Sequence, residues 1–381
     1  MILSKLSYIE LANTSRYWEI EEFELGKINL LVGHNTSGKS RTLSVIVGLS
    51  RILISPQVSL ASGLFNAFLS DKNVVYNYIV GFEEGMITQE KLIRNEIELF
   101  SRDSEGIGEI LNEYSNTKQK FKVPKNQLVA TRRDEIQFPY LEELYKWASS
   151  TRHFRFSKEA EKHTLSLIDS NQPITDVNNQ DMVNQAITVF RIGKANFRKK
   201  FVDNVIRDFN SIGYSISNID YGVLQSLKVD SSAGNKVSGL RVFETDREGM
   251  TDQNEMSDGM FRALSLIIHY NYYELTEKNL NIAIDDIGEG LDYEKSTSLI
   301  KLLIEKTKNT EIQLIMSSND KFVMNNTNLE YWQAITRKGG KVKMHNKFNS
   351  KDSFDEFKFT GLNNFDFFTT EFYKSQPNNE L

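Results

Sequence analysis

Residues 28–49, INLLVGHNTSGKSRTLSVIVGL, decide the fold class of this chain. They form an apolar run, a loop bounded by Gly33 and Gly38, and a helical run that opens with Lys39 and Ser40. These four residues fit G-x-x-x-x-G-K-[ST], a motif whose backbone N–H groups and following helix N-terminus hold phosphates. A glycine-rich strand-to-helix turn without a ligand is the alternative. We favour a nucleotide site in an α/β protein, because the strand and the helix that the motif requires both flank the loop.

The loop residues have distinct expected roles. Lys39 is expected to reach the β- and γ-phosphates, and Ser40 to give its hydroxyl to Mg²⁺. Thr36 is β-branched, so we expect that the loop does not use a positive φ at this position. The nucleotide-binding residues expected here are Gly33, Asn35, Ser37, Gly38, Lys39, Ser40 and Arg41.

Length and composition limit the class of protein. A chain of 381 residues has room for two domains, or for one domain with an insertion. It has no Cys, which excludes a disulfide framework and thiolate metal sites and fits a reducing cytoplasm. The N-terminus lacks a signal-peptide pattern and the apolar runs are too short to span a bilayer, so we expect a cytoplasmic protein without a membrane partner. The net charge of −5 gives no overall attraction to nucleic acid.

Residues 280–296, LNIAIDDIGEGLDYEKS, provide the acidic half of a nucleotide site. The first part reads as a buried parallel strand, and acidic residues follow at its C-terminal end, where α/β sheets bind ligands. Asp285 is the expected Mg²⁺-side carboxylate. Asp286 is the expected base that orients water, with Glu289 as the alternative base. The alternative is a purely structural role, an acidic loop in which Asp292 caps the next helix.

Residues 257–259 form a short polar turn before an amphipathic helix. Ser257 is a plausible N-cap, Asp258 follows it, and Gly259 allows close backbone approach. A helix N-terminus of this kind can bind a phosphate group. Taken alone, the pattern is more typical of a capped helix.

The order of these parts resembles the ABC-type ATPase heads of the RecF/SMC class. MSDGM at 256–260 is similar to the family's signature motif, which would place Ser257, Asp258 and Gly259 on a phosphate. The resemblance also matches Asp285 with the family's Walker B Asp and Asp286 with its catalytic Glu. It matches Asp292 with the D-loop, and Asn319 in QLIMSSNDKF with the switch His. Gln137 is a candidate for the Q-loop Gln, which would contact Mg²⁺ and the attacking water. A solvent-facing Gln is the alternative at that position.

The resemblance implies a fold: an α/β core with a mostly parallel sheet, an antiparallel β-layer and an inserted helical lobe. Residues 73–109 read as successive strands, which favours the β-layer. We divide the chain into an N-terminal ATPase lobe (1–150), an inserted helical arm (151–230) and a C-terminal ATPase lobe (231–381).

The resemblance also implies a mechanism, in which ATP is held between the phosphate loop of one subunit and the signature motif of another. This requires a homodimer or a higher homo-oligomer. Asp286 is one methylene shorter than the family's Glu, and Asn319 cannot titrate as the family's His does. Because poorly placed base catalysis typically costs about 10²–10⁴-fold, we expect a slow ATPase.

The chain is also similar to small ATP-binding proteins of bacterial defence and toxin–antitoxin loci, which implies a separately encoded effector. A RecF-like repair ATPase that contacts DNA is one alternative, and a scaffold that binds ATP without hydrolysing it is another. The most basic region, 182–213 together with 152–155, reads as a contact to a phosphate backbone or as a solvated helix face with its aromatic residues in the core. We favour the second interpretation. The aromatic tail at 357–374 is expected to pack on the body or to form a subunit contact.

Overall fold

The computed structural model describes residues 1–55, 62–156, 166–167, 186–226, 237–277 and 279–374. They form two compact units. Unit 1 comprises 1–151, 313–319 and 327–381, and unit 2 comprises 152–312 and 320–326. The three-part division at 150 and 230 stays a prediction. The α/β fold class is confirmed, since strands and helices alternate through both units.

Unit 1 is built on parallel strands around the strand that precedes the phosphate loop. This strand, β3 (Ile28–Val32), is buried along its whole length. It pairs in parallel with β16 (Ile312–Ser318) on one side and with β17 (Trp332–Lys338) on the other. Because β3 is a central strand of the sheet, all of its side chains are buried, and the sequence does not alternate between buried and exposed residues. The loop that follows β3 therefore starts from a rigid position.

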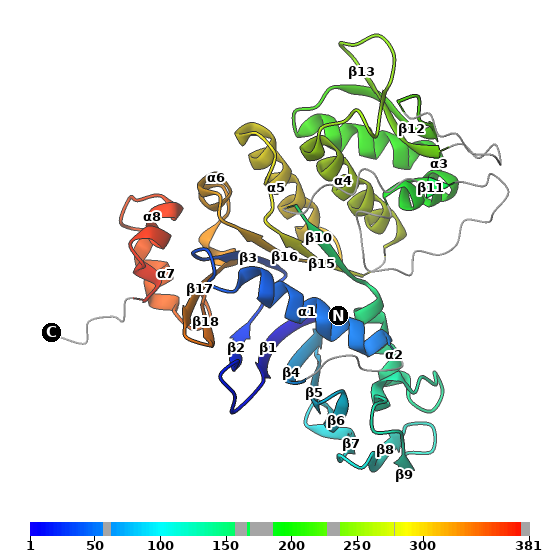
Figure 1. Cartoon of the computed structure of the whole chain (residues 1–381), viewed down its shortest axis with the longest axis vertical. Helices are drawn as coiled ribbons and strands as arrows, with labels where there is room; N and C mark the ends of the chain where they lie inside the picture. Colours follow the sequence, from blue (N-terminus) through cyan, green and yellow to red (C-terminus); the bar gives the residue numbers. More distant parts are fainter. Residues whose placement is uncertain (56–61, 157–165, 168–185, 227–236, 278, 375–381) are drawn as a thin grey trace. The chain divides into compact units, whose positions relative to one another are not determined.

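The same sheet continues into an antiparallel part (Figure 1). The linking strands are β18 (Lys341–His345), β2 (Trp18–Glu24) and β1 (Ile2–Glu10), and the order then runs through β4 (Ser62–Asp71), β5 (Val74–Glu83), β6 (Met86–Arg94), β7 (Ile97–Arg102), β8 (Ile107–Asn112) and β9 (Thr117–Lys122). The expected β-layer is thus confirmed. It is hydrogen-bonded to the parallel core in one continuous sheet rather than lying beside it.

Helices of unit 1 lie around this sheet. α1 (Lys39–Ile54) and α2 (Pro139–Ser149) lie side by side, with the one-turn helix η1 (Val129–Thr131) near both. The C-terminal part comprises η4 (Leu329–Tyr331), α7 (Lys351–Phe357), α8 (Asn364–Thr369) and η5 (Phe372–Lys374). Its aromatic rings pack on one another and on β17, for example Phe367 on Trp332 at 6.1 Å between ring centroids. The expectation that this segment packs on the body is confirmed.

Unit 2 contains the strand neighbours β10 (Thr151–Arg155) and β15 (Leu280–Asp285), and the helices α4 (Asp258–Thr276), α5 (Tyr293–Lys308) and α6 (Lys321–Asn325). A small antiparallel sheet accompanies them, made of β11 (Ser166–Leu167), β12 (Ile216–Val223), β13 (Val237–Glu244) and β14 (Thr251–Asp252). The inserted region is therefore not purely helical.

The long helix α3 (Ala186–Ser211) of unit 2 packs against α4 and is two helices joined at a kink. Arg198 at the kink has φ 51° and ψ −131°, outside the helical region. Phe201 is fully buried against Phe190, whereas Lys199 is exposed and pairs with Asp203 at 2.8 Å. These contacts support the solvated-face interpretation of the basic segment. The first residues of that segment, 182–185, lie outside the described residues.

Candidate functional site

The phosphate loop of unit 1 joins β3 to α1. Gly38, the N-cap of α1, has φ 109°, a conformation that favours glycine. A Cβ on Gly38 would lie 3.0 Å from the Trp18 ring, so close packing also requires glycine here. Lys39 is 6% exposed, and its ammonium donates hydrogen bonds to the carbonyls of Gly33 (2.7 Å) and His34 (3.2 Å). The cation is thereby held at the mouth of the loop, where it can meet a phosphate.

Thr36, at the tip of the loop, has φ 68°. The expectation that this position avoids a positive φ is therefore wrong. A left-handed conformation costs a β-branched residue roughly 1–2 kcal/mol, so another contact has to hold it. Arg337 at the end of β17 provides that contact, because its guanidinium donates to the Thr36 carbonyl at 2.9 Å and to the Gly339 carbonyl at 2.7 Å.

Two further features of the loop point to a ligand. The Ser37 hydroxyl is buried and has no hydrogen-bond partner among the described residues. An unsatisfied buried hydroxyl is costly, and a bound group would satisfy it. Asn319, which follows β16, donates from Nδ2 to Oδ1 of Asn35 at 3.0 Å. The residue expected in the switch position is thus in contact with the phosphate loop.

Arg41 and Arg337 both lie over the ring of Trp18, with guanidinium-to-centroid distances of 4.0 Å and 4.9 Å. Arg41 also forms an ion pair with Glu10 of β1. The two arginines and the tryptophan place positive charge beside the start of α1, which has no acidic residue in its first turn. Such a setting favours an anionic ligand.

Gln137 has its side chain engaged within unit 1. Its Oε1 accepts from Asn112 Nδ2 at 3.0 Å, and its Nε2 donates to Asp134 at 3.3 Å. These bonds fix the turn that leads into α2. The expected role of Gln137 on Mg²⁺ and water stays a prediction, and it would require these bonds to rearrange.

The acidic residues of unit 2 lie where β15 ends. Asp285 is 6% exposed, and its carbonyl accepts from the Phe156 N–H at 2.9 Å. Asp286 has φ 53°, so the chain turns sharply directly after Asp285. The Glu289 N–H closes this turn on the Asp286 carbonyl at 3.2 Å, and the Glu289 side chain is exposed. Both candidates for the base are therefore on one turn, and the choice between them stays a prediction.

The two segments that resemble the signature motif and the D-loop meet in unit 2. Ser257 caps α4 by accepting from the Met260 N–H at 3.2 Å, which confirms the expected N-cap. A Cβ on Gly259 would lie 2.3 Å from the Gly290 carbonyl oxygen, so only glycine fits between the two segments. Asp292 caps α5, and its ion pair with Lys295 lowers the pKa of the carboxyl group. The D-loop role of Asp292 stays a prediction.

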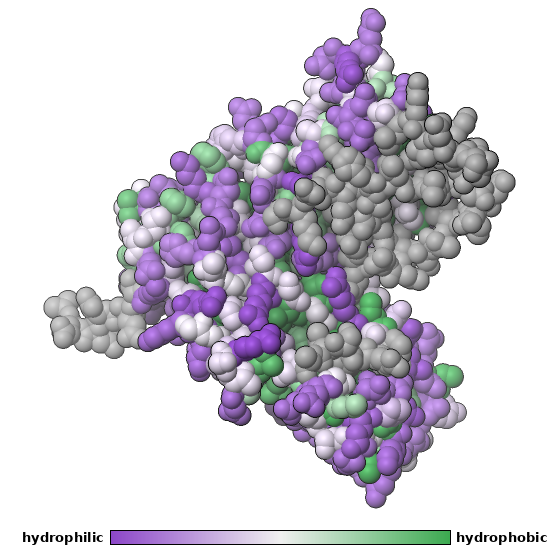
Figure 2. Space-filling view, viewed as in Figure 1, coloured by the Kyte–Doolittle hydropathy of each residue, from purple (hydrophilic) through white to green (hydrophobic). Residues whose placement is uncertain are grey.

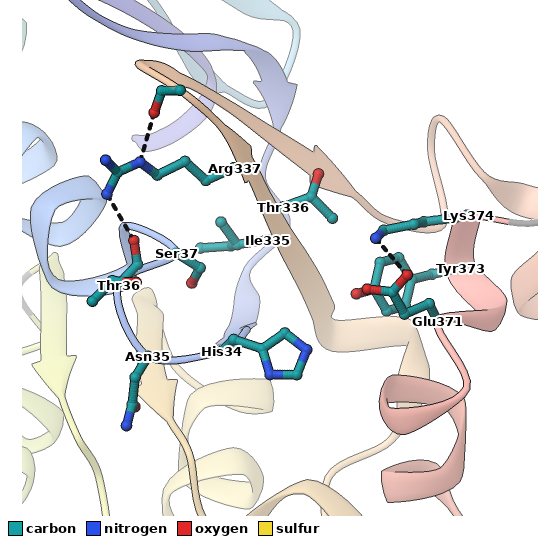
Figure 3. Close-up of a pocket in the computed structure, with 11 residues that line it drawn as sticks. His34, Asn35, Thr36, Ser37, Ile335, Thr336, Arg337, Glu371, Tyr373 and Lys374 are labelled. Atoms are coloured by element: carbon teal, nitrogen blue, oxygen red, sulfur yellow. Dashed lines mark hydrogen bonds and ion pairs between the residues drawn. The ribbon is translucent and has the colours of Figure 1, made fainter.

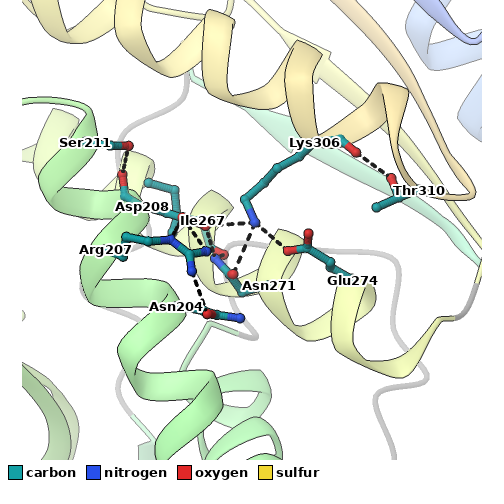
Figure 4. Close-up of polar contacts among 9 residues, drawn as sticks. All are labelled: Asn204, Arg207, Asp208, Ser211, Ile267, Asn271, Glu274, Lys306 and Thr310. Carbon is teal, nitrogen blue, oxygen red and sulfur yellow. Dashed lines mark hydrogen bonds and ion pairs between the residues drawn. The ribbon is translucent and has the colours of Figure 1, made fainter.

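A buried polar network joins the helices that carry these segments (Figure 4). The Lys306 ammonium of α5 lies 2.8 Å from Asp208 of α3 and 3.3 Å from Asn271 of α4, and it also pairs with Glu274. Asn271 donates to Asp208 at 2.8 Å. Because the residues come from three helices, the network sets the positions of α4 and α5 relative to α3.

The positioning residues Trp18, Arg337 and Lys306 did not emerge from the sequence. Arg337 lies in TRKGGKVK, a basic hairpin that gives no signal of a contact with residue 36. Among the described residues, no helix is long and apolar enough to cross a lipid bilayer.

Comparison with known proteins gives distant structural likeness. No family model matches the chain, and no curated protein matches it. Solved structures that resemble it include an SMC head bound to the C-terminal winged-helix domain of ScpA (12% identity, 90% of this chain and 97% of that one, TM-score 0.49) and the SMC head domain from Thermotoga maritima (13%, 90% and 98%, TM-score 0.43). A third is the Pyrococcus furiosus SMC head with an extended coiled coil bound to the C-terminal domain of ScpA (12%, 93% and 99%, TM-score 0.46). At these identities and TM-scores, support for a function has to come from the chain's own residues.

Proposed function

We propose that this chain is an ATP-binding, slowly hydrolysing ABC-type ATPase whose ATP-dependent dimerisation regulates a separately encoded effector, in bacterial anti-phage defence. The phosphate loop carries the proposal. It combines a left-handed Gly38 at the head of α1, the Lys39 ammonium held over loop carbonyls, and the unsatisfied Ser37 hydroxyl. These are the features that a polyphosphate requires.

The proposed roles follow from side-chain chemistry. Lys39 and the loop N–H groups bind the phosphates, while Ser40 and Asp285 hold Mg²⁺, which neutralises phosphate charge when bound. Asp286, or alternatively Glu289, orients water. Asn319 is held by Asn35 and can hydrogen-bond the terminal phosphate without titrating. A short carboxylate and a non-titrating amide support a slow rate.

The dimer part of the proposal is supported by the signature turn. Ser257 and Asp258 are exposed at the start of α4, whereas Gly259 is packed against Gly290. A helix N-terminus presented in this way is suited to a phosphate that a second copy of the chain brings. The effector and the defence role are supported by the sequence resemblance alone.

The test follows mass by light scattering and phosphate release with Mg²⁺ and no nucleotide, ADP or ATP. Wild type is compared with Lys39→Ala, Ser257→Arg and Asp286→Asn. The matched control is Ser104→Arg, the same substitution at an exposed turn of the β-layer.

We expect ATP to raise the mass of wild type and of Ser104→Arg but not of Ser257→Arg. Lys39→Ala should abolish nucleotide binding, and Asp286→Asn should keep the dimer while stopping phosphate release. A mass that ATP does not change in wild type would refute the ATP-dependent dimer. ATP that binds and stays intact in wild type would instead favour the non-hydrolysing scaffold.

A further inference from the structure

A cavity of about 590 Å³ borders the phosphate loop in unit 1 (Figure 3). Its walls are residues 34–37 of the loop, residues 335–337 and 339 at the end of β17, and residues 371, 373 and 374 at η5. This volume lies in the range of roughly 300–1,000 Å³ that is typical of small-molecule sites. Lys39 and Ser40 are not among its described lining residues, whereas Asn35 and Ser37 are shared with the proposed nucleotide site, so the cavity adjoins that site without including the Lys39 ammonium.

The chemistry of the lining suits an anion. Arg337, Lys374 and His34 are exposed around the cavity, and the one carboxylate among the lining residues, Glu371, pairs with Lys374 at 2.6 Å. In Figure 3 Arg337 and Lys374 reach this region from two different elements, the end of β17 and η5.

The lining also offers a flat ring to an organic group, because the His34 side chain is exposed. Tyr373 is 1% exposed and Ile335 is 2% exposed, so both are fixed by packing beneath the cavity. Tyr373 contacts the Phe368 ring, and His34 contacts the same ring at 4.8 Å. An aromatic group can lie on the exposed His34 ring while a phosphate faces Arg337 and Lys374, because arginine recognises phosphate through paired N–H donors.

We propose that this cavity binds a small organic phosphate ester and that its occupancy loosens the phosphate loop. The link is Arg337, which holds the strained Thr36 by its carbonyl at 2.9 Å. A phosphate ester that engages the guanidinium competes with that carbonyl, so Thr36 loses the contact that keeps it left-handed. The affinity for ATP then falls, and by linkage bound ATP lowers the affinity for the ester by the same factor. The binding site stands independently of the proposed function, while the coupling rests on it.

The first experiment measures binding of phenyl phosphate by calorimetry. Inorganic phosphate and phenol are measured separately as comparison ligands, because each carries one of the two groups of the probe. It uses the full chain carrying Lys39→Ala, which disables the phosphate loop. Lys374→Ala is added to this background, and Lys358→Ala is the matched control, since Lys358 is also exposed and pairs with a carboxylate three residues earlier.

We expect phenyl phosphate to bind the Lys39→Ala protein more tightly than inorganic phosphate or phenol does. Adding Lys374→Ala should weaken binding about tenfold, as the loss of a charge-assisted hydrogen bond predicts, and adding Lys358→Ala should not. Loss of binding in Lys39→Ala would overturn the proposal, because the probe would then have occupied the phosphate loop. Equal effects of Lys374→Ala and Lys358→Ala would also overturn it.

The second experiment measures ATP affinity of the wild-type chain with and without saturating phenyl phosphate. We expect the dissociation constant of ATP to rise by about 5-fold or more, and Lys374→Ala to need correspondingly more probe for the same effect. An unchanged ATP affinity at saturation would refute the coupling. Failure of wild type to bind ATP at all would refute the proposed function, while the calorimetric result would still decide the cavity.

Discussion

Replacing Lys306 by Met is expected to lower the free energy of unfolding of unit 2 by about 2–3 kcal/mol. The side chain of Lys306 is 9% exposed, and its ammonium is the cation shared by Asp208 and Glu274. Met has a similar length and fills the space without a charge. The change therefore isolates the electrostatic part of the network from its packing.

The expected loss of unfolding free energy follows from the contacts that Asp208 and Glu274 keep once the ammonium is removed. Removing one member of a buried ion pair typically costs about 3–5 kcal/mol, because the other charge stays buried without compensation. Asp208 is 3% exposed but retains Asn271 at 2.8 Å and Arg207 at 3.0 Å. The side chain of Glu274 is 33% exposed, so water can hydrate it. These compensations reduce the expected cost below that range, to about 2–3 kcal/mol.

Urea unfolding measured by circular dichroism tests the prediction, with Lys301→Met as the control on the exposed face of the same helix. The double variant Lys306→Met/Asp208→Asn should recover part of the loss, because the buried negative charge is then absent. The proposed ATP-driven dimerisation should weaken in Lys306→Met, since α4 and α5 begin at the segments that resemble the signature motif and the D-loop. A loss below about 1 kcal/mol, or one equal to that of Lys301→Met, would refute the reasoning.

Three further outcomes are expected. Burial raises the pKa of Glu90 from 4.5 to about 7, so the folded state keeps a proton on Glu90 between these two pH values. The free energy of unfolding therefore falls by about 3 kcal/mol as the pH rises from 4.5 to 7. Urea midpoints at pH 5 and pH 8 should show this fall, and Glu90→Gln should not show it. Gly259→Ala places a Cβ 2.3 Å from the Gly290 carbonyl oxygen and should abolish ATP-dependent mass change in light scattering, whereas Gly48→Ala, where a Cβ meets nothing within 4 Å, should not. Thr36→Gly relieves left-handed strain and should raise the melting temperature, corresponding to up to about 1 kcal/mol; a lower melting temperature would show that Thr36 is unstrained.

The sequence predicted the features that depend on local patterns. The run before Gly33 is a fully buried strand, and the helix after it begins at Lys39, as the motif requires. The strand before Asp285 and the N-cap at Ser257 also lie where apolar runs and capping residues placed them. Each of these depends on residues within about ten positions of one another.

The remaining features depend on residues far apart in the chain. Arg337 is 301 residues from Thr36 in the sequence and donates a hydrogen bond to its carbonyl. This contact stabilises the left-handed conformation of Thr36, which a β-branched residue was not expected to adopt. The fit of Gly259 against Gly290 depends on how two segments meet, and glycine alone did not reveal it. Propensity describes a residue's own backbone, whereas tertiary contacts decide such cases.

The last strand of the continuous sheet, β9, has a consequence for solubility. It ends the strand order of unit 1, and its sequence TKQKFK carries Lys118, Lys120 and Lys122, with five of its six residues exposed. Figure 2 shows hydrophilic side chains covering most of the end of the molecule where Figure 1 places β7–β9. Lysines along an outer strand repel a second copy that would extend the sheet. The charge on β9 therefore disfavours pairing of two copies through this edge of the sheet.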